Sequence, residues 1–179
     1  MRIRHGPAVI ALVVAATTIT LAQPALADVT TTTFTVEPGD LAETSPASAD
    51  LGDAVPGASA EAQLGAVTVT DTRAALSGTW TESVSSTAFT TGGATPVETV
   101  PVASISYWSG PATATSGSGT FTPGQATSAA AQTFAASRTA FSWAGDGNNS
   151  ATFNPTLIVA MPASAVAGEY TGTVTHSVA

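Results

Sequence analysis

The chain contains no cysteine and no lysine, and its four arginines stand against twelve acidic residues in a length of 179. Without cysteine there is no disulfide scaffold, so a folded domain must be stabilised by its core alone. The shortage of cations argues against a nucleic-acid partner, because binding phosphate backbones needs clustered Lys or Arg. It argues in the same way against an anionic membrane surface as a partner.

Large apolar side chains are also scarce. Ile, Leu, Val and Phe together number 35 of 179 residues, close to the fraction at which disorder becomes a concern. Charged residues make up only 9%, however, whereas ordinary disorder combines low hydrophobicity with high charge. The 31 threonines favour strands when they alternate with larger side chains. The composition therefore predicts a small, acidic β domain rather than a helical bundle.

Residues 1–27 have the pattern of a secretory signal. Arg2 and Arg4 precede an uncharged, largely apolar run over residues 8–21, and Ala25-Leu26-Ala27 supplies a small-x-small cleavage pattern. The run of about 14 residues is shorter than the roughly 20 that a spanning helix needs. Cleavage after Ala27 would leave residues 28–179 with a net charge of −10. We therefore expect a secreted protein, extracellular or associated with the cell wall, with no membrane span after cleavage.

Alternation of apolar and polar residues is the dominant pattern after residue 28. Eight or more short strands with one apolar face predict an all-β fold, an antiparallel β-sandwich of Ig-like or jelly-roll-like type, in a single domain over residues 28–179. Residues 37–63 hold six acidic residues and no basic one, which indicates an acidic, loop-rich segment with one strand. The alternation is clearest over residues 67–70, 79–84, 152–161 and 170–178, and weaker over 30–36, 41–46, 97–102, 104–108, 119–122 and 139–143.

Catalytic and metal-binding patterns are missing. After the signal there is one histidine, His176, and no thiol or G-x-S-x-G elbow. A site of nitrogen or sulfur ligands would need a second His or Cys. Residues 146–149 (DGNN) fit a hairpin turn better than a calcium loop, which needs spaced carboxylates and a terminal Glu. The acidic segment is either solvated or a loose calcium site. We therefore expect a non-catalytic protein without a metal or cofactor.

Four aromatic residues are candidate binding residues, because aromatic rings on a sandwich face can stack on sugar rings. Tyr107 and Trp108 are adjacent, so on a strand they point to opposite faces, and we expect one of them to be exposed or at a sheet edge. Trp80 and Trp143 are the other two candidates. The alternative for each ring is packing in the core.

Two stretches of sequence carry a family resemblance. Residues 64–73 (LGAVTVTDTR) followed by 78–85 (GTWTESVS), and then residues 162–175 (PASAVAGEYTGTVT), are together similar to the order of motifs in WxL domains. The resemblance covers most of the chain after the signal. It implies an exported Gram-positive cell-surface protein with a β-sandwich fold, held non-covalently to the cell wall with peptidoglycan as ligand.

The departures from the family fall on the W-x-L motifs themselves. The first reads Trp80-Thr81-Glu82 and the second His176-Ser177-Val178, so only Trp80 matches a signature position. Glu82 shares its strand parity with Trp80 and Val84, which places a carboxylate on a core-facing row. Since a buried carboxylate without a partner is costly, we expect Glu82 to pair with His176 or Arg73, to raise its pKa, or to lie on a row that faces solvent.

The function predicted from these observations is an exported, non-catalytic cell-surface protein that associates with cell-wall glycan or other surface proteins. The alternative is a structural subunit of a surface layer or fibre, assembled by pairing of edge strands. A secreted carbohydrate-active enzyme comes third and would require two carboxylates about 5 to 9 Å apart in a cleft.

Overall fold

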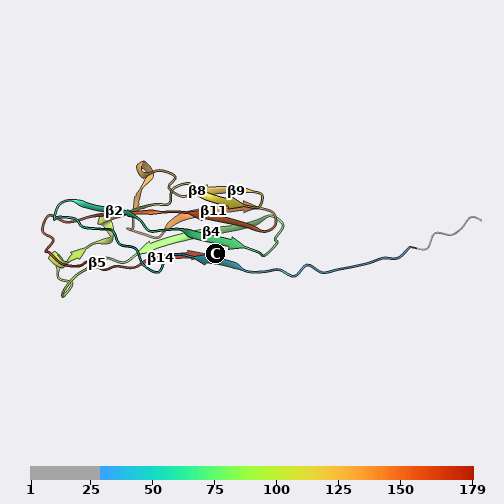
Figure 1. The fold of residues 1–179 in the computed structure, drawn as a ribbon, viewed down its shortest axis with the longest axis horizontal. Helices are drawn as coiled ribbons and strands as arrows, with labels where there is room; N and C mark the ends of the chain where they lie inside the picture. The colour runs from blue at the N-terminus through green and yellow to red at the C-terminus, as the bar shows by residue number, and fades with distance from the viewer. Residues whose placement is uncertain (1–28) are drawn as a thin grey trace, which may run out of the picture. The chain divides into compact units, whose positions relative to one another are not determined.

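The structure, a computed structural model, describes residues 29–179, so the predicted signal at residues 1–27 lies outside the described residues. The chain divides into two units, Met1–Thr35 and Val36–Ala179. Residues 29–40 belong to no helix or strand, so the strand predicted over residues 30–36 is not formed. All the strands belong to the second unit (Figure 1). No helix within residues 29–179 has the length and apolar character needed to cross a membrane.

Three segments of the chain each supply two successive strands, one strand to each of two four-stranded sheets. In the first sheet the order is β1-β3-β12-β8, and in the second it is β10-β7-β13-β2. Leu64 N donates to Pro155 O at 2.8 Å, which joins the two sheets where they meet. The strands are β1 (Leu41–Thr44), β2 (Ser59–Gln63), β3 (Val67–Asp71), β7 (Ile105–Trp108), β8 (Ala112–Ser116), β10 (Gln132–Thr133), β12 (Asn149–Phe153) and β13 (Thr156–Ala160).

The third sheet has the order β14-β4-β11-β9, and Figure 1 shows β14, β4 and β11 side by side. A two-stranded sheet, β5-β6, and three short 3-10 turns complete the unit. Every strand pair is antiparallel, so the prediction of an all-β antiparallel sandwich is confirmed. The remaining bounds are β4 (Gly78–Ser86), β5 (Phe89–Thr90), β6 (Thr99–Val100), β9 (Thr120–Pro123), β11 (Arg138–Gly145), β14 (Val174–Val178), η1 (Pro96–Glu98), η2 (Val102–Ser104) and η3 (Ser128–Ala130).

The core is built from the inward-facing side chains, which alternate with outward-facing ones along each strand. On β4, Trp80, Glu82 and Val84 are all buried, as the parity predicts. The rings of Phe141 and Phe153 stack with centroids 5.0 Å apart and link β11 to β12. The inward side chains of β14 are only half-buried, because β14 is an edge strand.

Several sequence expectations need correction. The acidic segment 37–63 holds two strands, β1 and β2, rather than one, and β8 was missed because its sequence, ATATS, has no large apolar residue. Prolines 96 and 101 limit the strand expected over residues 97–102 to the two residues of β6, which lie between two 3-10 turns. Residues 146–148 form the β11–β12 turn, where Asp146 Oδ1 accepts a hydrogen bond from Ser77 N at 2.6 Å.

Candidate functional site

The outward face of β4, β11 and β9 carries short hydroxylated side chains and no charge. Alternation along each strand sends Trp80 and Trp143 inward and their neighbours outward. The register aligns these neighbours in two rows about 7 Å apart, with about 4.8 Å between strands. The rows are Thr81–Ser142–Thr122 and Thr79–Ala144–Thr120.

This hydroxyl face is hollowed into a shallow depression of about 270 Å³. None of its five side-chain hydroxyls forms a hydrogen bond with the residues that the structure describes. On the outward face of β3, β12 and β8, four hydroxyls bond to one another, Thr68 to Thr152 at 3.0 Å and Ser116 to Ser150 at 2.7 Å, and Thr70 makes no side-chain hydrogen bond within the described chain. The hydroxyl face therefore keeps its donors and acceptors available to a ligand.

A buried polar network anchors Trp80 beneath this face. Trp80 Nε1 donates to Asn149 Oδ1 at 2.8 Å, and Asn149 Nδ2 donates to Asp71 Oδ2 at 3.3 Å. Arg73 donates two parallel hydrogen bonds of 2.9 Å to the carboxylate of Asp71 and a third to Thr79 O. The hydrogen bonds from Arg73 hold the pKa of Asp71 below its ordinary value of 3.8. The network thus joins the VTDTR run to the strand that carries Trp80.

Asn149 is the residue of this network that sequence reasoning missed. It lies at the end of a Gly/Asn-rich turn, where an Asn side chain is expected to hydrogen-bond the turn's own backbone. Its burial follows from the register, which places Asn149 opposite Asp71. The only sequence signal was that Asn149 opens a strand of alternating parity, with Ala151 and Phe153 on the same face.

Glu82 is fully buried, and neither of its carboxylate oxygens accepts a hydrogen bond within the described part of the chain. Burial raises its pKa from 4.5 to about 7, and the negative charge of Glu43 on β1 adds to this shift. The backbone N–H of Ser177 acts in the opposite direction and more weakly. Of the outcomes expected for Glu82, burial without a partner supports the raised pKa.

The predicted pair between Glu82 and His176 is not formed, and Arg73 is engaged by Asp71 instead. The register of β14 on β4 places His176 opposite Val84 and Val178 opposite Glu82. The imidazole instead points across the interior, with Nε2 3.2 Å from the hydroxyl oxygen of Tyr107. Burial lowers the pKa of His176 from 6.5 to about 4, and burial together with the Glu82 charge raises the pKa of Tyr107.

The four aromatic candidates do not form a binding platform. Trp80, Tyr107 and Trp143 are buried, so core packing is the outcome for these three. Trp108 is half-buried and its strand β7 is not an edge strand, so neither ring of the adjacent pair is exposed or at a sheet edge as expected; the indole N–H of Trp108 has no partner among residues 29–179. Tyr107 packs against Phe134 with ring centroids 5.7 Å apart.

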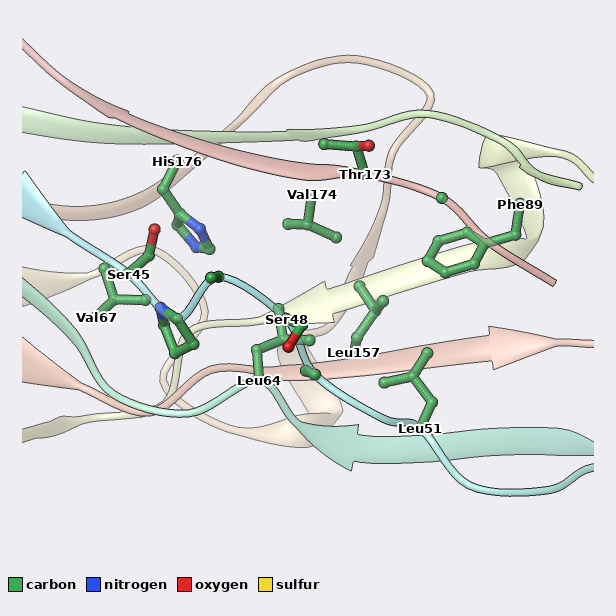
Figure 2. A pocket seen from close by; sticks show the side chains of 14 residues that line it. Ser45, Ser48, Leu51, Leu64, Val67, Phe89, Leu157, Thr173, Val174 and His176 are labelled. Carbon is green, nitrogen blue, oxygen red and sulfur yellow. The ribbon is translucent and has the colours of Figure 1, made fainter. Parts of the chain in front are cut away.

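A second hollow, lined by both apolar and polar side chains, opens beside β14 and has a volume of about 190 Å³ (Figure 2). Figure 2 shows the side chains of Leu51, Leu64, Val174 and His176 directed into the same space from different segments. Neither this cavity nor the depression of the hydroxyl face is lined by a carboxylate. Within residues 29–179, no group of three or more His, Asp or Glu residues is arranged to hold a metal ion.

Fold and sites together define an antiparallel β-sandwich with a neutral hydroxylated face and a small cavity of mixed polar and apolar lining at an edge strand. Comparison with protein-family models, with curated proteins and with solved structures finds no match for this chain.

Proposed function

We propose that this chain is an exported, non-catalytic cell-surface protein that associates non-covalently with cell-wall glycan, with peptidoglycan as its ligand, through the hydroxyl face. The observation that carries the proposal is the set of hydroxyls on β4, β11 and β9 without hydrogen-bond partners in the described chain. Sugar hydroxyl and amide groups can donate to and accept from such side chains, directly or through water. The resemblance to WxL domains supports the same ligand.

The chemistry of the face fits a neutral, extended polymer. Its rows are uncharged, line a shallow depression and are repeated across three strands, which offers many weak contacts instead of one deep pocket. The strand that carries Trp80-Thr81-Glu82 lies within it, and Trp80 supports it from below through Asn149. In this proposal the tryptophan acts by positioning the strand, and the outward threonines contact the glycan.

The test is sedimentation of the secreted chain with purified cell-wall sacculi. Replacing Thr81 and Thr122 by Val removes two hydroxyls and keeps the β-branched shape, so we expect at least tenfold weaker pelleting. The matched control replaces Thr44 and Thr70 by Val, because both point outward from the opposite sheet; this variant should pellet like the natural chain. Equal pelleting of the two variants would contradict the placement of the ligand.

A further inference from the structure

The cavity beside β14 has walls from all four sheets. Val174 lies on β14, Leu157 on β13, Val67 on β3 and Phe89 on β5. Val67 and Leu157 are fully buried members of the core, so the cavity reaches into the interior of the sandwich. Residues 45–51 run along one side of it (Figure 2). The cavity is therefore a recess between strands, with this loop as one wall.

The cavity has room for one six-membered ring with its substituents. Its volume is about 190 Å³, whereas a cavity of roughly 150 Å³ can hold a benzene ring. Leu51, Leu64, Leu157 and Val174 present carbon atoms to this space from different segments (Figure 2). A ligand that fits therefore needs at least one apolar face.

Polar groups suited to a hydroxyl ligand border the same space. Nε2 of His176 is taken by the hydroxyl of Tyr107, whereas Nδ1 has no partner within residues 29–179 and is accessible to solvent. A neutral imidazole has one donor and one acceptor, so Nδ1 is either of the two, and a hydroxyl group can satisfy both cases. Ser45 and Ser48 also line the cavity (Figure 2), and their hydroxyls form no hydrogen bond within the described chain. A ligand can therefore place hydroxyl groups against two parts of the wall.

The lining of the cavity carries no charged side chain. Burial lowers the pKa of His176 from 6.5 to about 4, so the imidazole is neutral at pH 7. An anionic ligand would find no cation in this wall and a cationic ligand would find no carboxylate. Since burying an unpaired charge is costly, the cavity favours an uncharged ligand.

We infer that the cavity beside β14 binds one uncharged pyranose sugar ring, with its C–H face against Leu64 and Leu157 and its hydroxyls toward His176 and Ser48. Small-molecule sites commonly combine an apolar lining with a few placed polar groups. A pyranose matches both parts of the wall, because hydroxyls surround a ring whose faces are largely C–H. A ring with a single hydroxyl leaves one set of polar groups without a partner.

Space for a single ring restricts where the sugar comes from. The cavity takes a free monosaccharide or the terminal sugar of a chain, and not a continuous stretch of polymer. The hydroxyl face on β4, β11 and β9 shares no lining residue with it. The sugar site is thus separate from the face proposed to bind wall glycan and does not rest on that proposal.

An NMR titration of the secreted chain at pH 7 is the first test. His176 is the only histidine after the predicted signal, so its imidazole signals report on this cavity alone. Glucose, galactose and N-acetylglucosamine are the probes, and at least one should shift these signals in a saturable way. Cyclohexanol, which has one hydroxyl, and glucuronate, which has a carboxylate, should bind at least tenfold more weakly than that sugar. If no sugar shifts the signals, or if cyclohexanol or glucuronate binds as tightly, the inference is overturned.

A disaccharide of the sugar that binds distinguishes the two sources. Binding of the disaccharide with similar affinity supports recognition of a chain end. Binding of the monosaccharide alone supports recognition of a free sugar.

Variants locate the site. Leu51→Trp places a large side chain in the cavity and should weaken sugar binding at least tenfold, whereas Val55→Trp is the matched control, because Val55 is 68% exposed and does not line the cavity. His176→Phe keeps a ring but removes both nitrogens, and should also weaken binding at least tenfold, measured from the signals of the sugar itself. Natural affinity in either Leu51→Trp or His176→Phe would overturn the inference. The Thr81→Val/Thr122→Val variant should bind the sugar like the natural chain, which separates failure here from failure of wall binding.

Discussion

Replacing Glu82 by Gln should change how the stability of the domain depends on pH. In the folded chain the pKa of Glu82 is raised from 4.5 to about 7. The folded state therefore binds more protons than the unfolded state between these values, and the free energy of unfolding falls as pH rises through this window. At one pKa unit per 1.36 kcal/mol, the full contribution is roughly 3 kcal/mol.

His176 acts with the opposite sign. Its pKa is lowered from 6.5 to about 4, so the unfolded state binds more protons between these values, and the free energy of unfolding rises with pH by roughly 3 kcal/mol. Across pH 4.5 to 6.5 the contributions of Glu82 and His176 nearly cancel in the natural chain. Asp71, whose pKa is lowered from 3.8, contributes only below this window.

Two variants separate these contributions. In Glu82→Gln the His176 contribution remains, so the free energy of unfolding should increase between pH 4.5 and 6.5. In His176→Gln the Glu82 contribution remains, so it should decrease between pH 4.5 and 7. Urea unfolding at several pH values, followed by the fluorescence of buried Trp80 and Trp143, measures both slopes. If the free energy of unfolding changes with pH in the same direction in both variants, or if the Glu82→Gln profile equals that of the natural chain, this account of Glu82 and His176 is refuted.

Three further stability predictions follow from the packing and can be checked by urea unfolding at pH 7. Asn149→Ala leaves Trp80 Nε1 without its acceptor and removes a donor to Asp71, and should cost about 1–3 kcal/mol; a loss below 0.5 kcal/mol would contradict the importance of the network. Phe141→Ala removes a fully buried ring and should cost about 3–5 kcal/mol, and a smaller loss than for Asn149→Ala would be inconsistent with the core described. Gly117→Ala should cost more than about 1 kcal/mol, since its φ is +83° and an added Cβ would meet the β11–β12 turn; no loss would show that this backbone conformation is not maintained.

Strand parity predicted much of the interior. The alternation in residues 79–84 places Trp80, Glu82 and Val84 on one face, and all three are buried. Parity alone does not give the register between strands, however. The pairing of Glu82 with His176 failed for this reason, because the register offsets the two residues and the imidazole meets Tyr107 on the facing sheet.

Local sequence patterns could not predict the hydroxyl face or the polar network, because both depend on the register between strands. Thr81 and Thr122 become neighbours of Ser142 only through the register of three strands. Asn149 looks like a turn residue until β12 is placed against β3. Residues 30–36 show the opposite case, because a strand was expected there and none is formed.

The most direct measurement of the central proposal compares sacculus binding by the natural chain and the Thr81→Val/Thr122→Val variant. We expect the natural chain to pellet with purified sacculi in a saturable way and to be released without proteolysis, and the variant to bind at least tenfold more weakly. A natural chain that remains wholly in the supernatant would contradict wall binding by this protein.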